Sequence, residues 1–237
     1  MDLIQKLRWW ITAGVEESIG DAPQNRMKPA PAQPSAADKA NPVVVQAEQA
    51  ARACADIAAL NRAKEEADCP LKKTSAHTIV GRGSEHPVVL CIAESPGAAD
   101  DKADRLFAGE TGELVDRMLA AVGLDLATNA YAAVLIPWRP PGNRAPTPVE
   151  IATCLPFLRR EIELLKPQFL LLFGNAVVEA LLGIRTLPKA RGIWHEYTIE
   201  GGTLPAVATL APATLKTPAQ KKLAWQDLQL LQEKLPK

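Results

Sequence analysis

The chain has 237 residues, of which 47% are hydrophobic, and its 27 basic and 27 acidic residues give a formal net charge of zero. This length and composition exclude a chain that is disordered throughout, and they indicate one large domain or one domain with a tail. A zero net charge is atypical of proteins that coat nucleic acid through bulk charge, so any nucleic-acid contact would need a local basic patch.

Membrane and disulfide signals are weak along the whole chain. No run of about twenty apolar residues occurs, and the first residues lack the pattern of a secretory signal peptide. We therefore expect a soluble, cytoplasmic protein with no membrane partner. The cysteines are widely spaced, without a C-x-x-C pair, and disulfides are disfavoured in the cytoplasm. The four are Cys54, Cys69, Cys91 and Cys154.

Three segments are predicted in chain order. Residues 1–20 predict an N-terminal helical extension, with a short amphipathic helix over 2–14. Residues 21–42 contain five prolines and almost no large apolar residue, which is typical of a linker. Asn41 and Pro42 then match a helix cap and a first helical position, so a helix of about twenty residues is expected from Val43 towards Lys64. The domain itself is predicted to cover residues 43–237.

The rest of the chain alternates between apolar strands and amphipathic helices. Strands are predicted at 87–93, 130–136, 168–174, 192–199 and 204–210, and helices at 112–123, 148–166, 175–183 and 219–235. This order predicts an α/β fold with three layers, α/β/α, around a mostly parallel sheet of four to five strands. Ligands bind such sheets at the carboxyl ends of the strands, so the loops of interest are 94–109, 137–147, 174–175 and 211–217.

Two of these loops carry groups that could do chemistry. The first, AESPGAADDKADRLFAGETG, joins a Pro-Gly turn to two adjacent carboxylates, but it lacks the phosphate-binding motif G-x-x-x-x-G-K-S/T and the dinucleotide motif G-x-G-x-x-G. Taken alone it is most often a solvated turn. The second, IPWRPPGNRAPTPVE, is stiffened by prolines, and its arginines either pair with surface acids or contact phosphates and bases.

In combination, these segments resemble the family 4 uracil-DNA glycosylases over roughly residues 60–235. The matching segments, in order, are AESPGAADD, LFAG, WRPPGNRAPTPVEIATCLPFL, KPQFLLLFGNAVVEALLG, RGIWHEY and PAQKKLAWQDL. Members of this family flip a base out of the DNA stack and hydrolyse its glycosidic bond. The resemblance therefore implies a uracil-DNA glycosylase fold and a role in base-excision repair.

The resemblance also implies roles for individual residues. Asp100 matches the acidic position that activates water, Glu94 also matches the first motif, and Asp101 adjoins them. Phe107 matches the ring that stacks on the base, and Ser95 lies in the same base-binding loop. The strand of DNA would be held by four residues of other loops, namely Arg139, Asn143, Arg144 and Lys216.

The chain departs from the family at two polar positions. The family's asparagine that reads uracil corresponds to Val134, four residues before Trp138. Val134 would therefore form part of the base-binding site. The histidine that stabilises the departing base is matched by Ala211 or, in an ungapped alignment, by Leu210. None of these side chains forms hydrogen bonds, and the histidines of the chain, His77, His86 and His195, lie far from this loop in sequence.

The family often carries a 4Fe–4S cluster held by four cysteines, and here only two of those positions match. Cys69 and Cys154 occupy them, whereas the other two are Glu66 and Trp138. A cluster needs four thiolates, so the sequence disfavours one, and Trp138 is expected to fill its volume by packing. No other metal is expected.

Two interpretations follow. One is a glycosylase of base-excision repair with weak or altered activity, acting on uracil or another damaged base. The other is a non-catalytic relative that binds DNA or a repair protein without cutting. The expected DNA is uracil-containing or abasic, single- or double-stranded, and the protein is expected to be a monomer.

Overall fold

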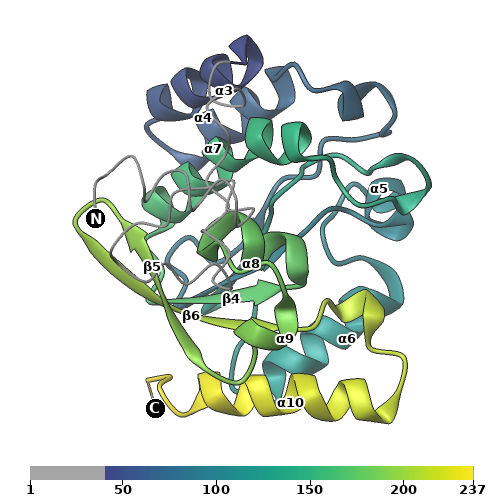
Figure 1. Ribbon diagram of the computed structural model, residues 1–237, viewed down its shortest axis with the longest axis vertical. Coiled ribbons are helices and arrows are strands. Elements are labelled where there is room, and N and C mark those ends of the chain that lie inside the picture. Colours follow the sequence, from purple (N-terminus) through teal and green to yellow (C-terminus); the bar gives the residue numbers. More distant parts are fainter. Residues whose placement is uncertain (1–40, 237) are drawn as a thin grey trace, which may run out of the picture. The chain divides into compact units, whose positions relative to one another are not determined.

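A computed structural model describes residues 41–236 (Figure 1). The predicted extension over 1–20 and nearly all of the predicted linker over 21–42 lie outside the described residues. Where the description begins, Asn41 caps the first helix through a hydrogen bond from the Val43 amide to its side chain, 3.1 Å long, and Pro42 is the first helical residue. This helix start was predicted from the Asn-Pro pair.

The described chain has a six-stranded sheet in the order β1-β3-β2-β4-β6-β5. The central strands β3, β2, β4 and β6 are parallel to one another, and the edge strands β1 and β5 are antiparallel to their neighbours. The strands are β1(Arg82–Gly83), β2(Val89–Ala93), β3(Ala130–Val134), β4(Phe169–Phe173), β5(Trp194–Ile199) and β6(Gly202–Thr209). Five of them were predicted, whereas β1 is too short for any periodicity to reveal.

Helices cover both faces of this sheet. They are α3(Pro42–Ala53), α4(Ile57–Glu66), α5(Ala98–Ala103), α6(Gly109–Ala120), α7(Pro148–Leu165), α8(Asn175–Leu182), α9(Leu187–Ala190) and α10(Pro218–Gln232), with short 3-10 turns η1(Pro70–Lys73), η2(Pro141–Asn143) and η3(Pro212–Thr214). The helices predicted at 148–166, 175–183 and 219–235 correspond to α7, α8 and α10. The short α5 and α9 have too few residues to show a helical pattern.

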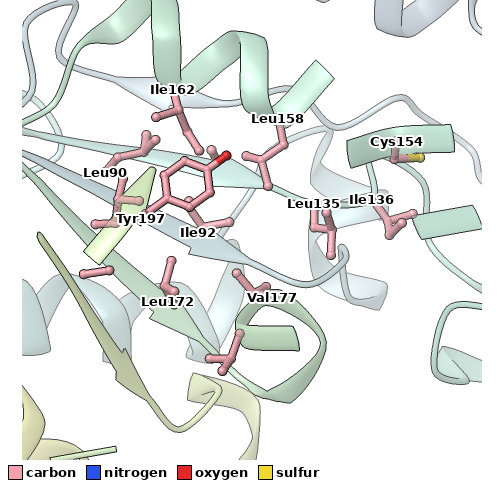
Figure 2. Packing of buried hydrophobic residues seen from close by; sticks show 14 of the residues in the cluster. Leu90, Ile92, Leu135, Ile136, Cys154, Leu158, Ile162, Leu172, Val177 and Tyr197 are labelled. Atoms are coloured by element: carbon pink, nitrogen blue, oxygen red, sulfur yellow. The ribbon is translucent and has the colours of Figure 1, made fainter. Parts of the chain in front are cut away.

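Alternate residues along each strand face opposite layers. On β2, Leu90 and Ile92 belong to a cluster with Leu158 and Ile162 of α7, and Figure 2 shows these side chains together. The intervening Cys91 belongs to the opposite cluster, which contains residues of α6 and α10. The three-layer α/β/α fold is thus confirmed, and its near-continuous apolar strands are explained by burial on both faces.

The predicted long helix after Pro42 is wrong, because the chain breaks it into α3 and α4. Asp56 caps α4 by accepting a hydrogen bond from the Ala59 amide at 2.7 Å. The carbonyl of Cys54, freed at the break, accepts two hydrogen bonds from the Arg160 guanidinium of α7, at 3.1 and 2.9 Å. The break lets both helices lie against the outer side of α7, around Phe157.

Among the described helices, none is both long enough and apolar enough to cross a membrane.

Candidate functional site

The four parallel strands end together at one edge of the sheet, and the loops that follow are joined by hydrogen bonds. The Leu135 amide after β3 donates to the carbonyl of Ala93 on β2, and the Gly174 amide after β4 donates to the carbonyl of Thr209 on β6, each at 2.9 Å. The loops predicted to carry the site are therefore neighbours in space. We call this the carboxyl edge.

Asp100 lies in the first turn of α5, in the segment that follows β2, and is buried, with 8% of its surface exposed. One carboxylate oxygen accepts a hydrogen bond from the Gly97 amide at 2.8 Å, and the other accepts one from the Ala108 amide at 2.6 Å. The first bond caps α5 and the second fixes the segment that carries Phe107. Each oxygen of the predicted catalytic acid therefore has a backbone partner.

Phe107 follows α5 in the same segment and is buried, with 4% of its surface exposed. Its backbone has a φ of 56°, in the left-handed region that is uncommon for residues other than glycine. A Cβ atom on Gly112 would lie 2.0 Å from the Phe107 carbonyl oxygen, so this close approach requires a glycine. The Phe107 ring meets the ring of Phe173 edge-on, with centroids 5.9 Å apart and planes at 89°.

Val134 ends β3 and is 1% exposed. It belongs to the same buried cluster as Phe107 and Phe173. The predicted stacking ring and the residue at the base-reading position thus lie in the same apolar cluster. The structure adds Phe173, which the sequence did not single out because it reads as one more apolar residue of a buried strand.

Glu94 and Ala211 both lie close to Gly174. A Cβ atom on Gly174 would lie 3.4 Å from the Ala211 Cβ and 4.0 Å from a carboxylate oxygen of Glu94. Burial raises the pKa of Glu94 above its usual range, against the opposing effect of a hydrogen bond from the Ala176 backbone. Ser95, next to Glu94, is half-buried.

Asp101 holds a turn from a distant part of the chain. One of its carboxylate oxygens accepts hydrogen bonds from the Ser75 hydroxyl at 2.9 Å and from the Ala76 and His77 amides at 3.0 and 3.1 Å. The His77 ring nitrogen Nδ1 lies 2.6 Å from the Asp101 backbone oxygen. Burial raises the pKa of Asp101, but these hydrogen bonds and the charge of Arg139 outweigh it, so that its pKa is lowered.

His77 is therefore at the carboxyl edge, although it lies far from these loops in sequence. The signal that could have found it is the pairing of an acid at a helix start with a polar turn, S-A-H, but the partner cannot be chosen from sequence alone. The predicted structural role of His195 agrees with its hydrogen bond to the Ala190 carbonyl, at 2.8 Å.

Of the four residues predicted to hold DNA, three are engaged in hydrogen bonds on the loop after β3. The Arg139 Nε donates to the Asn143 side-chain oxygen at 2.8 Å. Arg144 makes two bonds to Glu150, at 2.9 and 2.6 Å, and this pairing lowers the pKa of Glu150. The Lys216 side chain, in the loop after β6, is exposed.

The two matching cysteines lie in the buried core. Cys69 and Cys154 are buried in one cluster with Trp138. Interaction between the two thiols lowers the pKa of Cys69 and raises the pKa of Cys154. The Trp138 indole donates to the Thr78 hydroxyl at 3.0 Å, and Glu66 is exposed. The described chain contains no group of three or more His, Cys, Asp or Glu side chains placed to hold a metal ion.

A cleft of about 460 Å³ lies elsewhere on the described chain. It is lined by residues of α7, the end of α8 and β5, among them Arg159, Glu163 and Tyr197. Because β5 runs antiparallel to β6, its last residues lie toward the opposite edge of the sheet. This cleft is therefore separate from the carboxyl edge.

Comparisons with known proteins agree with this architecture. Residues 80–229 match the model of the uracil DNA glycosylase superfamily. The chain is 30% identical over 166 residues to the type-4 uracil-DNA glycosylase of Pyrobaculum aerophilum, covering 68% of this chain and 84% of the relative. It is 28% identical over 152 residues to that of Archaeoglobus fulgidus, covering 62% and 76%.

The corresponding protein of Thermotoga maritima is 34% identical over 133 residues, covering 55% of this chain and 69% of the relative. The matched region spans the sheet from the segment before β1 to α10 and so includes every loop of the carboxyl edge. The chain therefore belongs to the uracil-DNA glycosylase superfamily.

Proposed function

We propose that the protein binds DNA in base-excision repair and excises uracil far less efficiently than the active relatives. The observation that carries this proposal is the chemistry of the carboxyl edge. The position that would read the edge of a flipped pyrimidine is the buried, apolar Val134, and the position that would stabilise the departing base is Ala211 or, in an ungapped alignment, Leu210.

The missing groups have a large expected effect on catalysis. A base edge buried against Val134 loses hydrogen bonds to water without replacement, which costs about 1–3 kcal/mol per group. A preorganised donor to a developing anion is typically worth about 10²–10³ in rate. Together these effects make uracil a poor substrate even with Asp100 in place.

Asp100 supports the same proposal, because retention of the acid is explained without catalysis. Its two oxygens hold the Gly97 and Ala108 amides and thereby shape the loop. A carboxylate has further lone pairs that could orient a water molecule. The acid is thus compatible with weak hydrolysis but is also needed for the local fold.

Support for DNA binding comes from the family and from cationic side chains on the loops of the carboxyl edge. The relatives are uracil-DNA glycosylases by name. Arg139, Asn143 and Lys216 lie on loops that leave the carboxyl edge, and Arg139 and Lys216 are cationic donors of the kind that contact phosphates. The proposed ligand is uracil-containing or abasic DNA, single- or double-stranded, bound by a monomer, with repair proteins as further partners.

We also propose that this DNA binding needs no iron–sulfur cluster. Only two of the four matching positions are thiols, and Trp138 packs with both of them. Protein purified without oxygen is expected to contain neither iron nor acid-labile sulfide. Stoichiometric iron would contradict this.

A second candidate is excision of a different damaged base, and Glu94 favours it. Burial raises the pKa of Glu94, and its carboxyl group and Ala211 both lie close to Gly174, which supports a carboxyl group near the position of the missing histidine. A protonated carboxyl group can donate a hydrogen bond to a departing base. Such activity should increase at acidic pH and be lost in Glu94→Ala, whereas Glu94→Gln, whose amide also donates, should lose only the pH dependence.

Single-turnover cleavage of uracil-containing DNA tests the main proposal. Excess wild type and Asp100→Asn are incubated with single- and double-stranded substrate, and abasic sites are revealed with alkali. We expect little or no cleavage by wild type, together with measurable binding of the same DNA that weakens as salt is added. An active relative serves as the positive control.

Two results would contradict the proposal in different ways. Rapid cleavage by wild type that is lost in Asp100→Asn would establish an efficient glycosylase. An absence of DNA binding at low salt, by protein shown to be folded, would remove the DNA-binding role.

A further inference from the structure

A rigid turn presents His77 at the carboxyl edge. The Asp101 carboxylate accepts hydrogen bonds from the Ser75 hydroxyl and from the Ala76 and His77 amides. The Ser75 hydroxyl oxygen also accepts a hydrogen bond from the Arg139 amide at 3.2 Å. The turn 75–77, the start of α5 and the loop after β3 are therefore fixed to one another.

The hydrogen bond to the His77 ring fixes its proton arrangement. A backbone carbonyl oxygen can only accept, so the Nδ1 atom that lies 2.6 Å from the Asp101 oxygen must carry a proton. In the neutral ring, Nε2 then has no proton and can only accept. Nε2 becomes a donor only in the charged imidazolium, and the side chain is exposed to solvent.

Two charged residues belong to the elements bonded to this turn: Asp101 on α5, and Arg139 on the loop after β3, whose charge acts on Asp101. The Asp101 carboxylate is occupied by three donors from the 75–77 turn, while the Arg139 guanidinium is bonded to the neutral Asn143. A phosphate near this turn would meet a guanidinium and, when the ring is charged, an imidazolium. Both are donors that bind phosphates strongly.

We propose that His77 is a contact for the DNA backbone that operates only when its ring is protonated, so that DNA affinity rises as pH falls. This inference rests on the proposed DNA binding. It adds a specific contact and a pH dependence that the family assignment does not contain. The contact reaches the sugar–phosphate backbone, so it should act equally on different DNA sequences.

The test compares DNA affinity at about pH 6 and about pH 8, the interval in which histidines commonly change charge. Full-length wild type, His77→Ala, His77→Gln and His86→Ala are titrated with labelled abasic DNA. His86 is the matched control, because it is exposed and follows Ser84, whose amide pairs with Ala130 at the opposite end of β3.

We expect wild type and His86→Ala to bind about 5- to 10-fold more tightly at the lower pH. His77→Ala and His77→Gln should bind the abasic DNA at both pH values about as weakly as wild type does at the higher pH. At the lower pH, the slope of log affinity against log salt concentration should be smaller by about one in His77→Ala than in wild type. A melting temperature like that of wild type would show that the turn is intact, since the Ala76 and His77 backbone amides still bond to Asp101.

Two outcomes would overturn the inference. If wild type binds DNA but His77→Ala keeps both its affinity and its pH response, His77 is not the contact. If wild type does not bind DNA at either pH at low salt, the proposed function fails, and the inference fails with it. The wild-type titration alone separates these outcomes.

Discussion

Lys64 of α4 and Glu161 of α7 form an ion pair in the interior of the protein. Their charged atoms are 2.7 Å apart, and the side chains are exposed by only 1% and 0%. The Tyr131 hydroxyl donates to the other Glu161 oxygen at 3.2 Å, and burial, with the charge of Glu161, raises the pKa of Tyr131. Strand β3, helix α7 and the outer helix α4 are thus joined by one buried polar network.

Removing one member of this pair should be costly, because the other charge stays buried without a partner. We expect Lys64→Met to lower the free energy of unfolding by about 3–5 kcal/mol, and Lys64→Met combined with Glu161→Leu to lower it less. Urea denaturation measures both. As a control, Glu163→Gln breaks the partly exposed pair with Arg160 and should change stability by less than about 1 kcal/mol. Equal effects of Lys64→Met and Glu163→Gln would show that burial does not set the cost.

The sheet was predictable because its strands are buried on both faces. Runs such as residues 169–173 remain apolar throughout, and the helices between them begin at clear caps such as Thr147, whose side chain accepts a hydrogen bond from the Glu150 amide. The break between α3 and α4 was not predictable in this way. It depends on Arg160, a residue more than a hundred positions along the chain, which binds the freed Cys54 carbonyl.

The candidate site likewise has residues that a local motif predicts and residues that only tertiary contacts bring in. Asp100 and Phe107 lie within one loop, so a local motif was enough to bring them together. His77 and Phe173 reach the carboxyl edge through tertiary contacts, to Asp101 and to Phe107, that no local pattern records. The functional meaning of Val134 came from the resemblance, since a buried valine at a strand end is ordinary by itself.

The lowered pKa of Asp101 predicts how stability depends on pH. A carboxyl group whose pKa is lower in the folded than in the unfolded chain stabilises the fold at neutral pH, and that contribution is lost as pH falls through the folded pKa. We expect Asp101→Asn to be less stable than wild type by about 1–3 kcal/mol at neutral pH. The difference should narrow below the ordinary carboxyl pKa of roughly 3.9.

Urea unfolding at neutral and at acidic pH checks this expectation. Asp104→Asn is the matched control, because Asp104 ends the same helix but is exposed. A deficit in Asp101→Asn that stays constant down to the lowest pH would show that the charge of the carboxylate is unimportant.

Gly112 is predicted to be essential for the position of Phe107. A methyl group in Gly112→Ala would lie 2.0 Å from the Phe107 carbonyl oxygen and 2.6 Å from its carbonyl carbon, so the backbone must shift. We expect a loss of roughly 1–3 kcal/mol of unfolding free energy, as for other overpacked sites. Gly202→Ala, where a Cβ atom would meet nothing within 4 Å, should leave stability nearly unchanged. Thermal unfolding of the two variants, measured in parallel, distinguishes a lack of space from a general effect of adding a methyl group.

The two apolar replacements at the carboxyl edge can be reversed together. Val134→Asn alone puts an amide into a cluster with Phe107 and Phe173 and should cost about 1–3 kcal/mol of stability without producing activity. Val134→Asn combined with Ala211→His would supply both a group to read the uracil edge and a donor to the departing base. We expect single-turnover excision of uracil to rise by about 10²-fold or more over wild type.

The gain must depend on the acid of the first loop if it reflects glycosylase chemistry. Adding Asp100→Asn to the double variant should therefore abolish it, and DNA lacking uracil should stay intact in every case. If the double variant is folded, binds uracil-containing DNA and still gains no activity, the loss of Asn and His is not what limits excision. The buried Phe107, held edge-on against Phe173 rather than free to stack on a base, would then be the barrier, because the base could not enter beside it.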